Sequence, residues 1–84
     1  MKEEKEVGEV FDYFSKIGVA AIKLKASLKK GDTIHIKGHT TDFEQEVESI
    51  QIHNKAVDKA KKGEEVGIKM NDKVRKNDVV YLAE

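Results

Sequence analysis

At 84 residues the chain has room for one domain with a modest core. It contains no cysteine, which excludes thiol catalysis, disulfide bonds and cysteine-ligated zinc. It also has no apolar stretch near the ~18 residues that span a bilayer, and its start "MKEEKEV" lacks the apolar part of a signal peptide. We therefore expect a soluble, cytoplasmic protein with no membrane association.

Charge is abundant but segregated along the chain. The 16 basic and 16 acidic residues cancel formally, yet "IKLKASLKK" and "KAVDKAKK" are basic whereas "DFEQEVE" is acidic. All the basic residues except Arg75 are lysines. Lysine binds phosphate as a point charge, without the fork of a guanidinium group, so any RNA contact would be mainly electrostatic.

The chain begins with a charged segment, residues 1–5, which we expect to be flexible. Residues 6–84 form one domain in this interpretation. It contains no proline, and its glycines and Asn or Asp pairs recur at the spacing that short β-strands require. The first strand is predicted in "VGEVFDYF", where strict alternation places Val10 with Phe14 on one face and Phe11 with Tyr13 on the other.

Alternation continues in the next two segments. Ile22 and Leu24 are predicted to point inward from one strand, and Ile34 and Ile36 from the strand after the turn at Gly31. The acidic residues of "DFEQEVE" alternate along a further strand, where we interpret them as a solvated edge.

The middle of the chain breaks the alternation. Val47 and Ile50 differ in parity within "FEQEVESIQIH", which predicts a β-bulge near Glu48 and Ser49. Alternation then disappears, and the spacing of Val57 and Ala60 predicts one short helical turn around residues 55–61.

The last part of the chain returns to strands. Val66, Ile68 and Met70 are predicted to point inward, and Gly67 outward, where another backbone or a ligand can approach closely. After a turn in which Asn77 takes a positive φ, "VVYLA" forms the closing strand.

The order and spacing of "VGEVFDYFSKIGVAAIKL", "LKKGDTIHIKG", "VESIQIHNKAVDKAKKGEEVGIKM" and "VRKNDVVY" resemble the second domain of translation elongation factors Tu and one-alpha. The sequence is also similar to short stand-alone elongation-factor-like proteins and to a module appended to some collagenase-like peptidases. The resemblance implies an all-β fold, a six-stranded antiparallel closed β-barrel. Asn77 departs from the family pattern, which has a glycine in that turn.

The sequence contains no G-x-x-x-x-G-K-[ST] phosphate loop, so it predicts no GTPase activity. No serine has a plausible orienting base, which predicts a protein that is not an enzyme and has no catalytic residues. His35, His39 and His53 lack the spacing of a metal site, so we expect no metal and no cofactor.

The leading functional hypothesis is an RNA-binding module for the acceptor end of tRNA or for a ribonucleoprotein. The resemblance implies contacts from Gln51, His53 and Asn54, with Gly67 on the neighbouring strand. A basic rim would steer the phosphate backbone, and its residues would be Lys55, Lys59, Lys61, Lys62, Lys69, Lys73, Arg75 and Lys76.

The alternative is a protein-interaction module that docks on a larger enzyme such as a collagenase-like peptidase. Phe11 and Tyr13 are its candidate contacts, because one aromatic face of their strand has no evident cover. We expect a monomer in either case.

Overall fold

The computed structural model describes residues 4–83, and these contain strands and turns but no helix. The ten strands are β1 (Glu4–Phe14), β2 (Val19–Leu24), β3 (Leu28–Lys29), β4 (Thr33–Lys37), β5 (Asp42–Glu46), β6 (Ile50–Ile52), β7 (Lys55–Val57), β8 (Lys59–Ala60), β9 (Glu65–Lys69) and β10 (Val79–Ala83). The all-β prediction is therefore confirmed. The described residues include no helix long and apolar enough to cross a membrane.

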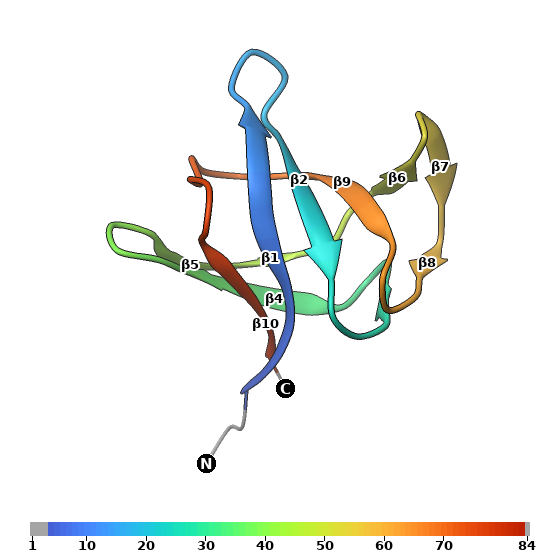
Figure 1. Ribbon diagram of the computed structural model, residues 1–84, viewed down its shortest axis with the longest axis horizontal. Coiled ribbons are helices and arrows are strands. Elements are labelled where there is room, and N and C mark those ends of the chain that lie inside the picture. The colour runs from blue at the N-terminus through green and yellow to red at the C-terminus, as the bar shows by residue number, and fades with distance from the viewer. Residues whose placement is uncertain (1–3, 84) are drawn as a thin grey trace.

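Eight strands form one curved antiparallel sheet in the order β5-β4-β10-β1-β2-β9-β6-β7, and β3 and β8 form a separate two-stranded pair (Figure 1). The sheet wraps around a single core of small and β-branched side chains. The largest fully buried side chains are those of Ile22, Leu24, Leu28, Ile34, Ile36, Ile50 and Ile68. The predicted inward positions on β2, β4 and β9 are all buried.

The prediction of a closed six-stranded barrel is wrong, because the sheet has two free edges, β5 and β7. The edge strand β5 has no ladder on its free side, but one of its side chains contacts the end of β9. The Gln45 amide nitrogen donates to the Lys69 carbonyl at 2.8 Å, and its oxygen accepts from the Asn71 amide at 2.7 Å. At the other edge the chain leaves β7 for β8, which pairs with β3 instead.

The helical turn predicted around residues 55–61 is also wrong. His53 and Asn54 have φ values of 51° and 65°, and Ile52 pairs with Lys55 across them. Two consecutive positive φ values in a two-residue loop are typical of a type I′ hairpin, which reverses the chain directly into β7. Val57 and Ala60 contact the core from two different short strands, which explains their helix-like spacing.

The break after β5 has a different form from the predicted bulge. β5 ends at Glu46 and β6 begins at Ile50, so residues 47–49 connect two strands instead of bulging within one. Val47 is buried there, and its amide donates to the Asp32 carbonyl at 2.8 Å. The predicted positive φ of Asn77 is confirmed at 76°.

Candidate functional site

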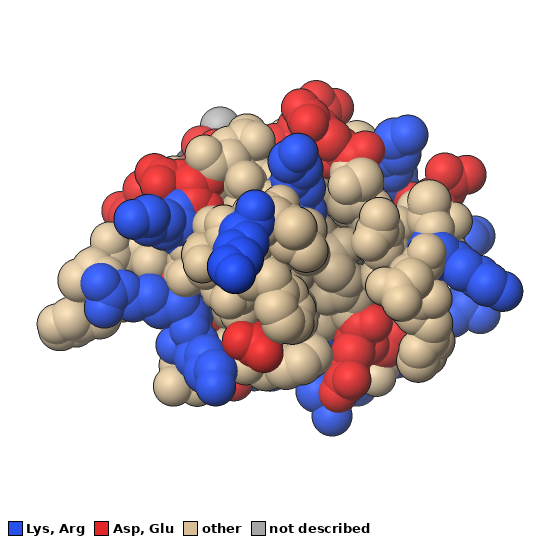
Figure 2. Space-filling view, turned by 90° about the horizontal axis from the view of Figure 1, so that it is seen from above, with Lys and Arg blue, Asp and Glu red and all other residues tan. Residues whose placement is uncertain are grey.

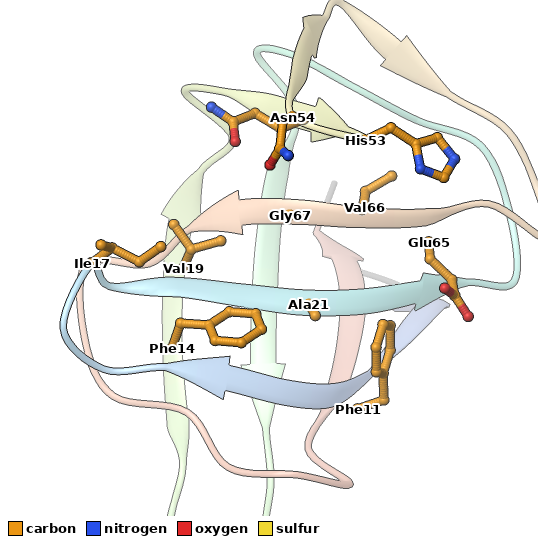
Figure 3. A pocket seen from close by; sticks show the side chains of 11 residues that line it. Phe11, Phe14, Ile17, Val19, Ala21, His53, Asn54, Glu65, Val66 and Gly67 are labelled. Carbon is orange, nitrogen blue, oxygen red and sulfur yellow. The ribbon is translucent and has the colours of Figure 1, made fainter.

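A shallow groove of about 240 Å³ crosses the outer face of β1, β2, β9 and the β6–β7 hairpin (Figure 3). Its floor is made of small residues. Ala21 and Gly67 are direct partners in the β2–β9 ladder, and Gly67 also pairs with Gln51 of β6. A Cβ built on Gly67 would approach Val19 to 3.2 Å, so even one added methyl group would crowd this floor.

One wall of the groove is apolar and exposed. Phe11, Phe14 and Ile17 retain 43%, 48% and 63% of their maximal exposure, and they are the large apolar side chains most exposed to water among residues 4–83. They come from β1 and the turn that follows it. Three such side chains on the same groove are unusual on a small domain, since contiguous apolar patches commonly mark interaction surfaces.

A β-bulge in β1 determines which aromatic side chains form this apolar wall. The register between β1 and β2 shifts between Val10 and Asp12, which inserts one extra residue into β1. Side-chain parity therefore changes in the middle of the strand, and Phe11 and Phe14 lie on the same outer face. Tyr13 packs against the core, so the prediction that it shares a face with Phe11 is wrong.

The opposite wall is polar and contains the residues proposed from the elongation-factor resemblance. Gln51, His53 and Asn54 line the groove together with Gly67. Phe11, one of the two docking candidates, and these four RNA-binding candidates therefore meet at the same surface. The sequence interpretation missed Phe14, Ile17, Val19, Ala21 and Glu65, although an isoleucine in the turn "SKIG" was a signal of an exposed apolar residue.

The predicted basic rim is exposed throughout but does not form one rim. Strands β7 and β8 lie at one end of the molecule, whereas residues 71–78 lie at the other end beside the β4–β5 hairpin (Figure 1). Acidic and uncharged side chains separate the basic groups on the face seen in Figure 2. Lys69 lies nearer the groove, as the ladder partner of Val19. These eight basic residues therefore do not form one continuous track for a phosphate backbone.

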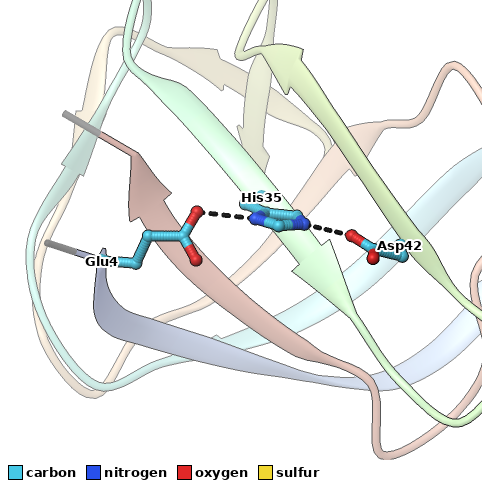
Figure 4. A network of polar contacts seen from close by, with 3 residues as sticks. All are labelled: Glu4, His35 and Asp42. Atoms are coloured by element: carbon cyan, nitrogen blue, oxygen red, sulfur yellow. Dashed lines mark hydrogen bonds and ion pairs between the residues drawn. The ribbon is translucent and has the colours of Figure 1, made fainter. Parts of the chain in front are cut away.

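A second polar cluster lies across β1, β4 and β5, around His35 (Figure 4). The Nδ1 atom of His35 is 2.6 Å from a carboxylate oxygen of Glu4, and Nε2 pairs with Asp42. Hydrogen bonding to Asp42, with a further contribution from Glu4, raises the pKa of His35 above its usual value. The same contact lowers the pKa of Asp42.

This cluster also brings three metal-compatible groups together. Donor atoms of Glu4, His35 and Glu44 lie within 4.8 Å of one another. Both ring nitrogens of His35 are already paired with carboxylates, so we interpret the cluster as an ion-pair clamp that joins three strands. The prediction that the protein binds no metal stays a prediction.

Comparisons with known proteins connect the chain to peptidases. No family model matches it. The chain is 51% identical over 78 residues to an uncharacterized protease of Methanocaldococcus jannaschii, covering 92% of this chain and 19% of that protein. It is 40% identical over 77 residues to a collagenase of Porphyromonas gingivalis, covering 89% of this chain and 21% of the collagenase. The chain thus spans about a fifth of the length of these relatives.

Solved structures agree on the fold. The C-terminal domain of a Geobacillus thermoleovorans protein described as a U32 peptidase superposes with a TM-score of 0.87 at 20% identity, covering 95% of this chain and 92% of that one. The selenomethionine variant of this domain gives a TM-score of 0.86 at 20% identity, covering 90% and 96% of the two chains.

These findings correct the family resemblance. The assignment to elongation factor domain 2 is wrong, and so is the description of the chain as a translation-factor-like, tRNA-binding protein, because the similar proteins are peptidases and collagenases. The other resemblance stated from the sequence, to a module of collagenase-like peptidases, agrees with them. No comparison tests the roles of individual residues.

Proposed function

We propose that this chain is a non-catalytic domain that docks on the catalytic part of a collagenase-like peptidase. The observation that carries the proposal is the exposed apolar wall of Phe11, Phe14 and Ile17 above a floor of small residues. A shallow apolar groove of this kind fits a folded partner whose side chains project into it.

The proteins similar to this chain support the choice of partner. In the protease and collagenase relatives, the matched segment occupies about a fifth of a longer polypeptide, so a similar segment is joined there to the rest of a protein named as a peptidase. The absence of a nucleophile with an orienting base leaves binding as the role that its residues can perform.

The energetics favour docking within one polypeptide. Full burial of a Phe or Ile side chain is worth about 1.5–3 kcal/mol, and these three are roughly half exposed, so together they supply about 3 kcal/mol. Hydrogen bonds at the polar wall add about 1 kcal/mol each. Association of two separate molecules costs at least about 4 kcal/mol of translational and rotational freedom, so a total of this size is sufficient only when a linker joins the two partners.

A cysteine-labelling experiment tests this proposal. The chain has no cysteine, so Ile17→Cys introduces a single thiol at the edge of the groove, and Lys30→Cys provides an exposed control outside it. Each variant is labelled alone and within a chimera in which the chain replaces the matched segment of the M. jannaschii protease. We expect the chimera to slow labelling of Ile17→Cys by about fivefold or more and to leave Lys30→Cys unchanged. Equal rates for Ile17→Cys in both settings would contradict docking at the groove.

A further inference from the structure

The groove carries charge at one end only. Among the described residues that line it, Glu65 is the only carboxylate, no lysine or arginine is present, and His53 is the only other ionisable side chain. Figure 3 shows the Glu65 carboxylate at the same end as the ring of Phe11. Glu65 is exposed and takes part in none of the ion pairs found within residues 4–83. An unpaired carboxylate beside an aromatic ring is a favourable setting for a cation.

The neighbouring strands leave this end of the groove with an excess of negative charge. Glu9 of β1, Lys23 of β2 and Glu65 of β9 are direct partners across two adjacent ladders, so they form one row on the same face. Lys23 therefore stands between two carboxylates. Lys25 also lies near Glu9 but is already paired with Glu6, so these three carboxylates face only two lysines. No nitrogen of Lys23 lies within ion-pair distance of Glu65, which leaves Glu65 free to pair with another molecule.

We infer that the groove recognises an apolar segment of the peptidase portion that presents a lysine or arginine at the Glu65 end. This inference rests on the proposed docking function and adds its specificity. The apolar side chains of the segment would pack on Phe14 and Ile17 over the floor of Ala21 and Gly67. Its cation would pair with Glu65 and cover the ring of Phe11. The charge fixes the direction in which the segment lies, because a reversed segment would leave Glu65 buried without a partner.

The test uses charge changes at Glu65 in the same chimera, with labelling of Ile17→Cys as the readout. Glu65→Gln removes the charge and Glu65→Lys reverses it. Glu48→Lys makes the same reversal at an exposed position outside the groove and serves as the matched control. Thermal unfolding of each isolated chain checks that it folds.

The inference predicts a graded response. Labelling should accelerate about threefold for Glu65→Gln and about tenfold for Glu65→Lys, approaching the rate of the isolated chain, because like charges at an interface oppose association. Glu48→Lys should have no effect. If Ile17→Cys stays protected in both Glu65 variants, the inference that a lysine or arginine pairs with Glu65 is contradicted, whereas the docking proposal still holds. If the chimera without a Glu65 change already lacks protection, the docking proposal fails and this inference fails with it.

Discussion

At the scale of single residues, His35 is the side chain whose ionisation is most closely tied to the fold. A neutral imidazole has only one N–H, so it can donate to only one of its two carboxylates, and the imidazolium form can donate to both. Because Glu4, His35 and Asp42 come from β1, β4 and β5, protonation of one ring holds three strands together. Three other ionisable side chains lie in this region. Glu44 on β5 and Tyr81 on β10 are the ladder partners of His35, and Lys37 lies on β4.

The pKa shifts give this clamp a defined pH range. The pKa of His35 is higher in the folded chain than its usual 6.5, so the stabilisation is complete below that value and is lost as pH rises through the folded pKa. The pKa of Asp42 is lowered from 3.8, so its contribution is present above that value and is lost as pH falls through the folded pKa. The clamp is therefore strongest between these two limits, in weakly acidic solution.

We predict that His35→Gln removes a pH-dependent part of the free energy of unfolding. The difference between wild type and His35→Gln, measured by urea unfolding at about pH 5.5 and about pH 9, should be larger at the lower pH. His39→Gln makes the same substitution at an exposed histidine in the β4–β5 turn and should leave the pH dependence as in the wild type. An equal difference at both pH values would show that His35 does not act through its charge.

At the scale of strands, the sequence pattern predicts faces better than it predicts connections. The inward positions Ile22, Ile34, Ile36 and Ile68 follow from alternation alone, because only one parity can be buried in a sheet with one solvated face. The connections between the later strands, from β6 onward, could not be predicted from alternation. The hairpin between β6 and β7 was missed because its two turn residues are His53 and Asn54, whereas a type I′ turn is usually recognised by Asn-Gly or Asp-Gly.

The bulge in β1 is a local feature that the sequence pattern does not predict, and it determines which aromatic side chains line the groove. Nothing in "VFDYF" marks the extra residue, because both parities carry an aromatic side chain. The bulge exchanges Tyr13 for Phe14 on the outer face and so completes the apolar wall. Bulges are set by pairing with the neighbouring strand, which a single-sequence pattern does not contain.

Gln45 is the side chain that links the free edge strand β5 to the end of β9. It is 6% exposed, and its two hydrogen bonds to the backbone of Lys69 and Asn71 connect β5 to a strand with which it forms no ladder. We predict that Gln45→Leu lowers the free energy of unfolding by about 2 kcal/mol, because the substitution removes both part-buried hydrogen bonds and leaves two backbone groups without these partners.

The matched control for this prediction is Gln51→Leu, which makes the same substitution at an exposed position of β6. It should change the free energy of unfolding by less than about 0.5 kcal/mol. Equal effects of the two substitutions in urea unfolding would indicate that the Gln45 amide does not stabilise the edge.

At the scale of the whole molecule, the groove is a product of tertiary structure. Its walls come from residues 11–17 and 51–54, and its floor from β2 and β9, so no contiguous motif of the sequence describes it. The sequence did identify Phe11, Gln51, His53, Asn54 and Gly67 as candidates, but it assigned them to two different functions. Their meeting at one surface, with basic residues dispersed to both ends of the molecule, favours a protein partner over a nucleic acid.

The measurement that tests the docking proposal most directly is hydrogen exchange across the whole chain, compared between the isolated chain and the chimera with the M. jannaschii protease. Docking at the groove predicts slower exchange in the β1–β2 turn, residues 14–19, and in the β6–β7 hairpin, residues 50–57. It predicts unchanged exchange in the β4–β5 hairpin, residues 37–42, which lies away from the groove. Unchanged exchange in both groove segments, or slowing confined to the β4–β5 hairpin, would contradict the account.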